Sequence, residues 1–168
     1  MSDLQSLYQT IILEHSKFRH GAVELAPLAE AVALGAVDGL RLAESHQINT
    51  TCGDEITLRV ALSAASDELS EADSAVAELV WAGEGCSISQ ASASILTDTL
   101  LGLGTIEARA LLENFREMLR SRGKIEPDEE ILGDAAAFGG VSRYPARVKC
   151  AMLPWVAFEA ALIEAESR

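Results

Sequence analysis

Cys52-Gly53-Asp54-Glu55-Ile56-Thr57-Leu58 places a thiol and a carboxylate directly before the clearest strand pattern in the chain. From Glu55 to Leu62 apolar residues occupy every second position, the alternation typical of a strand. The glycine between the thiol and the carboxylate permits a sharp turn, which can aim both side chains at one point. This stretch therefore predicts a strand that begins at a functional turn.

Weaker strand patterns lie on either side of this one. Even spacing of apolar residues over 40–48 predicts a strand before the turn, and residues 75–82 predict a third strand, after a polar turn around Ser66–Ser74. Three consecutive strands with short connections favour an antiparallel meander, with Asn49–Asp54 as the first turn. The remainder of the chain has helical patterns. The sequence therefore predicts an α+β fold, with a three-stranded antiparallel sheet packed against several helices.

The first helix is expected to bury Leu4, Leu7 and His15 on one face. We interpret His15 as a packed core or rim histidine, with metal ligation as the alternative. Lys17, Arg19 and His20 form a small basic end to this helix. They are interpreted either as a docking patch or as a solvated helix end.

The later helices are predicted from caps and breakers. A short helix is expected between Pro27 and Gly35, and Ser87 with Gln90 resembles a capping box. Further expectations are a helix capped by Thr105, a mostly loop segment over 121–134 with a solvated helix start at Asp128, and a last helix over 142–166 kinked by Pro154. The small residues 91–94 predict a close approach of another element.

Composition limits the possible classes of protein. The chain has 168 residues, 13 basic against 26 acidic side chains and a formal net charge of -13. The length predicts a single domain over residues 1–168. The negative charge argues against a nucleic-acid partner, and no apolar run reaches the length of a membrane span. Three cysteines without a secretory leader predict a reduced, cytoplasmic protein.

Cys52, Asp54, Cys86 and Cys150 are the candidate metal ligands. Three thiolates and a carboxylate are a donor set that zinc accepts in a tetrahedron. Cys86 precedes a predicted helix N-terminus, a position that favours negative charge. The gaps of 33 residues (53–85) and 63 residues (87–149) match no regular zinc motif. From spacing alone, three unrelated buried cysteines remain an open alternative.

Three motifs carry a family resemblance. They are the stretch at 52–58, Gly85-Cys86-Ser87-Ile88-Ser89-Gln90-Ala91-Ser92, and Arg147-Val148-Lys149-Cys150-Ala151. Together they resemble the iron–sulfur assembly proteins of the NifU N-terminal, IscU and SufU type. The similarity covers most of the chain except roughly 21–45 and 64–74. It implies the fold of that family, with the metal site at one end of the sheet.

Two features are similar to the SufU branch. The scaffold branch has a histidine immediately before the third cysteine, where this chain has Lys149, and the 87–149 gap resembles an insertion typical of SufU. The resemblance implies zinc held by the four candidate ligands. It also implies sulfur transfer from a SufS-type cysteine desulfurase to Cys52, and onward to the SufBCD assembly machinery.

The resemblance also leaves departures and alternatives. Thr50-Thr51 stands where a proline commonly precedes the turn, and Pro154 replaces a residue that is usually not proline. Arg147 and Lys149 are candidate cations beside the metal ligands, offsetting the charge of three thiolates and a carboxylate. The alternative functions are a scaffold that assembles a [2Fe–2S] cluster and a structural zinc adaptor.

Overall fold

A computed structural model describes residues 3–64 and 73–168. The strands β1 (Arg41–Asn49), β2 (Asp54–Leu62) and β3 (Val76–Glu84) form one antiparallel sheet in the order β1-β2-β3. Asn49 pairs with Asp54, and the neighbouring Glu55 pairs with Glu84. The first turn and the end of β3 therefore lie at the same end of the sheet. Most of the predicted second turn, Ser66–Ser74, lies outside the described residues.

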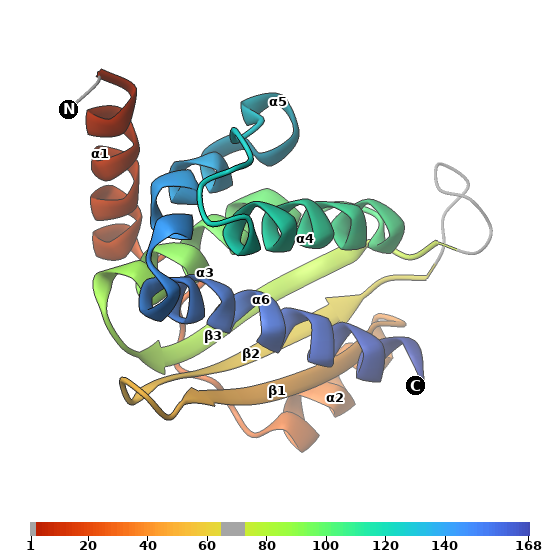
Figure 1. Cartoon of the computed structure of the whole chain (residues 1–168). Coiled ribbons are helices and arrows are strands. Elements are labelled where there is room, and N and C mark those ends of the chain that lie inside the picture. The colour runs from red at the N-terminus through yellow and green to blue at the C-terminus, as the bar shows by residue number, and fades with distance from the viewer. Residues whose placement is uncertain (1–2, 65–72) are drawn as a thin grey trace.

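The helices surround this sheet on both faces. They are α1 (Asp3–Phe18), α2 (Leu28–Val37), α3 (Ser87–Leu100), α4 (Thr105–Arg120), α5 (Glu129–Leu132), the 3₁₀ helix η1 (Gly133–Arg143) and α6 (Pro145–Glu166). In Figure 1, α6 crosses β1 and β2 with α3 beside it, whereas α2 lies against the other face of the sheet. Helix α1 stands at the end of the sheet and packs on α3 and η1. The predicted α+β fold is confirmed.

Both faces of the sheet are covered, which the strand alternation alone did not predict. Arg59, at an outward-facing position of β2, is only 7% exposed. Its guanidinium pairs with Glu44 at 2.5 Å and donates to the carbonyl of Ala26 at 2.6 Å. The segment before α2 therefore closes over this face, and the buried arginine is tolerated because its charge is paired.

The segment after α1 also protects an edge of the sheet. The backbone N–H of Val23 donates to the carbonyl of Trp81, and the N–H of Trp81 donates to the carbonyl of Gly21. These bonds add a short piece of chain beside β3, so its outer edge is not left open for pairing. The region 21–45, which departs most from the family resemblance, thus supplies an edge cover and the helix on the second face.

A tight α3–α6 contact holds the core together. The small residues 91–94 are fully buried, as predicted, and let the two helices approach closely. The Ser92 hydroxyl donates to the carbonyl of Ala151 at 2.5 Å and accepts from the Trp155 indole N–H at 3.0 Å. The Trp155 ring stacks on Phe115 of α4 at 4.2 Å between centroids. Helix α6 continues as one helix through the buried Pro154.

Several local predictions were wrong for identifiable reasons. Leu4 and Leu7 are about half exposed, because α1 projects beyond the sheet. Among the described residues of this helix only His15 is buried, and Tyr8, Ile11 and Ile12 are partly buried against the core. The capping box is absent at α3: Cys86 is the N-cap residue, and the Gln90 side chain accepts from Arg19 instead. Thr105 does not cap α4 as predicted: Gly104 is the N-cap residue, Thr105 is the first residue of the helix, and its hydroxyl donates to Asp73.

Residues 121–128 are loop, as predicted, and two short helices follow them. Asp128 caps the short helix α5 by accepting from two backbone N–H groups, as expected of a solvated helix start. The 3₁₀ helix η1 then fills most of the stretch between the predicted loop and the predicted last helix and includes Ser142 and Arg143, so α6 begins at Pro145 rather than Ser142. Buried residues 135–138 account for η1, since they pack into the core.

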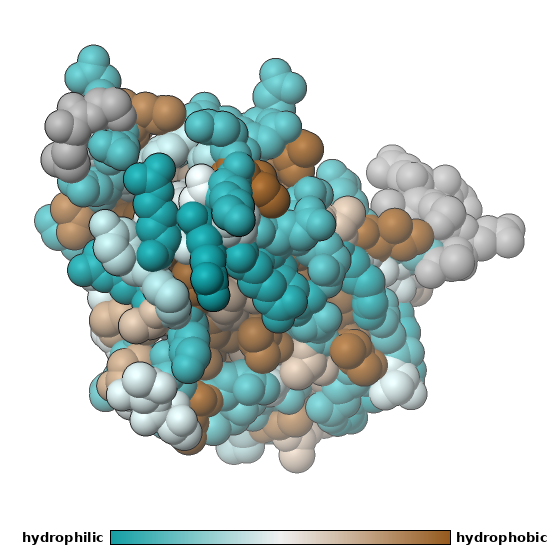
Figure 2. All heavy atoms as spheres, viewed as in Figure 1, coloured by the Kyte–Doolittle hydropathy of each residue, from teal (hydrophilic) through white to brown (hydrophobic). Residues whose placement is uncertain are grey.

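The surface agrees with the composition. Figure 2 shows mostly hydrophilic side chains on the face formed by α4 and α6, with apolar side chains scattered between them. Among the described helices, none has both the length and the apolar character needed to cross a bilayer.

Candidate metal centre

The four predicted ligands come together at one end of the sheet. The Sγ atoms of Cys52 and Cys150 lie 3.8 Å apart, and Cys86 Sγ lies 3.2 Å from Asp54 Oδ2. Ligand atoms of Cys52, Asp54 and Cys150 all lie within 4.8 Å of one another. In Figure 1 this is the left-hand end, where the β1–β2 turn, the end of β3 and the starts of α3 and α6 converge.

The β1–β2 turn presents Cys52 to solvent. Gly53 has a positive φ of 80° and donates its N–H to the carbonyl of Asn49 at 2.7 Å, which closes the turn. Only glycine adopts this left-handed conformation without steric cost. Cys52 is exposed, whereas Asp54, the first residue of β2, is 5% exposed. The turn therefore carries an accessible thiol directly above a buried carboxylate.

A close backbone approach brings Cys86 to Asp54. The Cys86 N–H donates to Asp54 Oδ1 at 3.2 Å, while its thiol faces Oδ2. A Cβ atom on Gly85 would lie 2.8 Å from Asp54 Cγ and 2.4 Å from Ser89 Oγ. The absence of a side chain at position 85 is thus what allows β3 and α3 to close over the carboxylate.

Burial and hydrogen bonding shift the pKa values of Cys150 and Asp54 in opposite directions. Cys150 is 7% exposed, and burial, followed by the charge of Cys86 and a hydrogen bond to Cys52, raises the pKa of its thiol. Burial also tends to raise the pKa of Asp54, but hydrogen bonds from the thiols and from the Cys86 backbone outweigh it and lower that pKa. The carboxylate is therefore ionised at neutral pH.

Asn49 and Ser89 are residues that the sequence analysis missed. Asn49 is 8% exposed, its Nδ2 lies 3.9 Å from Cys150 Sγ, and its Oδ1 accepts from the N–H of Thr51. Ser89 Oγ lies 3.8 Å from Cys86 Sγ. The Asn49 amide can donate to the sulfur of Cys150, whereas the Ser89 hydroxyl donates to the Cys86 carbonyl at 3.1 Å and accepts from the Cys86 thiol. Asparagine before a turn is a signal for Asx geometry, but not for a contact with a cysteine 101 residues away.

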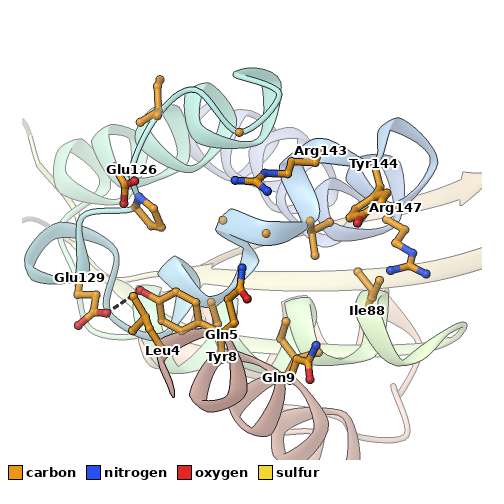
Figure 3. Close-up of a pocket in the computed structure, with 18 of the residues that line it drawn as sticks. Leu4, Gln5, Tyr8, Gln9, Ile88, Glu126, Glu129, Arg143, Tyr144 and Arg147 are labelled. Atoms are coloured by element: carbon orange, nitrogen blue, oxygen red, sulfur yellow. Dashed lines mark hydrogen bonds between the residues drawn. The ribbon is translucent and has the colours of Figure 1, made fainter. Parts of the chain in front are cut away.

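Arg147 and Lys149 lie on exposed positions of α6 on either side of Val148. The Arg147 guanidinium lies over the Tyr144 ring at 5.1 Å, a cation–π contact. Figure 3 shows Arg147 at the rim of a groove of about 1220 Å³ between α1, the 123–130 segment and η1. The role of Arg147 and Lys149 as cations beside the metal ligands stays a prediction.

Comparisons with known proteins agree with this fold. The model of the NifU-like N-terminal domain matches residues 30–151. The chain is 33% identical to the iron–sulfur cluster assembly scaffold protein IscU of Streptococcus pyogenes serotype M1, over 96% of this chain and 86% of that protein. It is 32% identical to the zinc-dependent sulfurtransferase SufU of Bacillus subtilis strain 168, over 98% and 95% respectively.

A solved structure gives the same result. The crystal structure of a putative iron–sulfur cluster assembly scaffold protein for the SUF system, from Fervidobacterium islandicum AW-1, superposes with a TM-score of 0.61 at 30% identity. The match covers 90% of this chain and 93% of that one. On the family match, the relatives and the shared fold together, the chain belongs to the NifU-like N-terminal family of iron–sulfur cluster assembly proteins, which includes IscU and SufU.

Proposed function

We propose that this protein is a single-domain, cytoplasmic, zinc-dependent sulfur acceptor in iron–sulfur cluster assembly. Cys52, Asp54, Cys86 and Cys150 are the proposed zinc ligands, and Cys52 is the proposed sulfur acceptor. The supporting observation is the contrast within the cluster: Cys52 is exposed on a turn, while Asp54 and Cys150 are buried beside it. Cys86 is exposed as well, but it is the N-cap residue of α3 and its backbone N–H donates to Asp54, so Cys52 on the turn is the ligand placed to react.

The donor set fits zinc. Three sulfur atoms and one carboxylate oxygen meet the usual coordination number, and they come from a turn, a helix start and a helix interior. When bound, zinc would hold the cysteine thiols deprotonated at neutral pH. Asn49 Nδ2 is placed to donate a hydrogen bond to the sulfur of Cys150, and Asp54 supplies the negatively charged oxygen.

The transferred sulfur passes between Cys52 and a persulfide donor, proposed to be a SufS-type cysteine desulfurase. The Cys52 thiolate attacks the outer sulfur of the donor persulfide, forming a new S–S bond as the old one breaks. The electron pair of the broken bond leaves with the donor cysteine as its thiolate. The outer sulfur changes carrier without net oxidation or reduction. The sulfur then passes to a SufBCD-type assembly complex in a second, equivalent exchange.

A [2Fe–2S] scaffold is the second candidate function, and the names of two similar proteins favour it. Lys149 opposes it, because the ammonium group next to Cys150 in this chain has no lone pair for iron. Aerobically purified protein discriminates between the two. A brown protein with iron and labile sulfide supports the scaffold, whereas a colourless protein with zinc supports the sulfur acceptor.

The function is tested by adding the protein to a SufS-type desulfurase and measuring cysteine turnover. Wild-type protein is expected to stimulate turnover, and Cys52→Ala is expected to abolish the stimulation while the circular dichroism spectrum stays unchanged. Full stimulation by a folded Cys52→Ala variant would reject Cys52 as the acceptor. That result would support a structural zinc adaptor instead.

A further inference from the structure

A second group of metal-ligand residues lies where α1 meets α3, away from the cysteines. His15 is in the last turns of α1, His20 follows that helix, and Asp98 is in α3. Ligand atoms of these three residues lie within 4.8 Å of one another. Asp98 lies 12 residues after Cys86 on the same helix, which is about 18 Å along its axis at 1.5 Å per residue. The group is therefore separate from the proposed sulfur site.

The His15 ring is oriented by a second carboxylate. Its Nε2 lies 3.2 Å from Asp134 Oδ2 in η1, and its Nδ1 lies 2.8 Å from Ser94 Oγ and 4.0 Å from Asp98 Oδ2. A proton on Nε2 satisfies Asp134 and turns the Nδ1 lone pair towards Asp98. When an imidazole binds a metal through one nitrogen, a carboxylate that accepts from the N–H of the other nitrogen orients the ring and raises the basicity of the metal-binding nitrogen.

The Ser94 hydroxyl has a definite role in this network. It accepts from the backbone N–H of His20 at 3.0 Å, so its own proton is donated to the His15 Nδ1 lone pair, and a metal bound at Nδ1 would replace this hydrogen bond. The His15 side chain is 10% exposed, while the side chains of His20 and Asp98 are about half exposed. The His15 ligand is thus fixed in the protein, whereas His20 and Asp98 are accessible to an ion from solvent.

We propose that His15 Nδ1, His20 Nδ1 and Asp98 form a second site for a divalent metal of the zinc type. Two imidazoles and one carboxylate suit zinc and leave a position for water or another ligand. His20 Nδ1 and Asp98 Oδ2, now 2.5 Å apart, separate by roughly 1 Å to take up metal–ligand bonds of about 2.0–2.2 Å. Both side chains are exposed enough to make this adjustment. A bound ion fastens the end of α1 to α3.

The test is a zinc titration of protein labelled with ¹⁵N in histidine, after one equivalent has filled the cysteine site. The chain has only three histidines, and the third, His46, bonds to Thr57 on the sheet. The second equivalent is expected to shift the Nδ1 resonances of His15 and His20 and to leave His46 unchanged. Equal shifts at all three histidines would mean an adventitious ion only. Unshifted resonances would mean that the histidines bind no zinc, and either result would overturn the proposal.

Matched variants locate the second ion. His20→Gln and Asp98→Asn are expected to lose the second equivalent in a chelator competition, while His46→Gln retains it. Asp134→Asn, which leaves all three ligands in place, is expected to weaken the second site by about 10- to 100-fold. Retention of the second equivalent by both His20→Gln and Asp98→Asn would overturn the proposal. The first equivalent is read separately, so failure here is distinct from failure of the cysteine site.

Discussion

Replacing Gly85 by alanine tests the geometry of the candidate metal centre at a position that is not itself a ligand. The new Cβ would lie 2.8 Å from Asp54 Cγ and 3.0 Å from its Oδ1. Carbon atoms in proteins do not approach so closely, so the carboxylate must move away from Cys86. The backbone at position 85 does not have a positive φ, and alanine is therefore accepted there without conformational strain.

The magnitude follows from the contacts that Asp54 loses. Its oxygens accept from the N–H and face the thiol of Cys86, both at 3.2 Å. Hydrogen bonds to charged groups contribute about 1.5–3 kcal/mol. Displacing the carboxylate is therefore expected to weaken zinc binding by about 10- to 100-fold, since 1.4 kcal/mol corresponds to a factor of ten. The assay is zinc competition with a chromophoric chelator at neutral pH.

Two further variants make this result specific. Gly140→Ala is the matched control, because a Cβ there meets nothing within 4 Å, and it should bind zinc like the wild type. Ser89→Ala added to Gly85→Ala removes the shorter 2.4 Å contact but leaves the one with Asp54. The double variant should therefore stay weak. Wild-type affinity in Gly85→Ala, or recovery in the double variant, would refute the role assigned to Asp54.

Three other predictions concern the elements that position the site. Ser92→Ala leaves the buried Trp155 N–H without its acceptor, and urea unfolding should show a loss of about 1–3 kcal/mol; an unchanged midpoint would contradict this. Gly53→Ala forces a positive φ on an L-residue and should cost about 1–2 kcal/mol, with Gly53→Asn costing less in the same assay. Asp73 accepts from a hydroxyl and backbone N–H groups at the start of α4, which lowers its pKa below 3.8. Its contribution to stability is therefore present above that pH and is lost as the pH falls through the lowered pKa. In Asp73→Asn, the free energy of unfolding should depend less on pH in the acid range than it does in the wild type. Parallel pH curves for the two proteins would argue against this role.

The sheet could be predicted because its signals are local, and the candidate ligands could be picked out because each stands in a local motif. Alternation around Ile56 defines β2, and each cysteine sits in its own recognisable motif beside glycine or a charged residue. The three motifs become one site through the antiparallel register, which places the Asn49–Asp54 turn beside the end of β3. The meander was predicted from the strand patterns, whereas the gathering of the three motifs into one site was implied by the family resemblance, and the structure brings the same side chains together.

What the sequence could not predict depends on contacts between distant segments. The sequence around Arg59 contains no signal that the segment at Ala26 will cover this side chain. Likewise, the apparent capping box failed because Gln90 has a better partner in Arg19, 71 residues away. The role of Gly85 is of the same kind, since its lack of a side chain matters only once Asp54 is packed against it. Local patterns identify elements, and tertiary contacts then decide what their polar side chains do.

Zinc K-edge X-ray absorption on protein loaded with one equivalent of zinc tests the central claim most directly. Cys52, Asp54, Cys86 and Cys150 predict three sulfur neighbours at about 2.3 Å and one oxygen at about 2.0–2.2 Å. Cys52→Ala should reduce the sulfur count by one. A first shell dominated by nitrogen and oxygen in the wild type would mean that the thiols gathered at the end of the sheet do not form a zinc site.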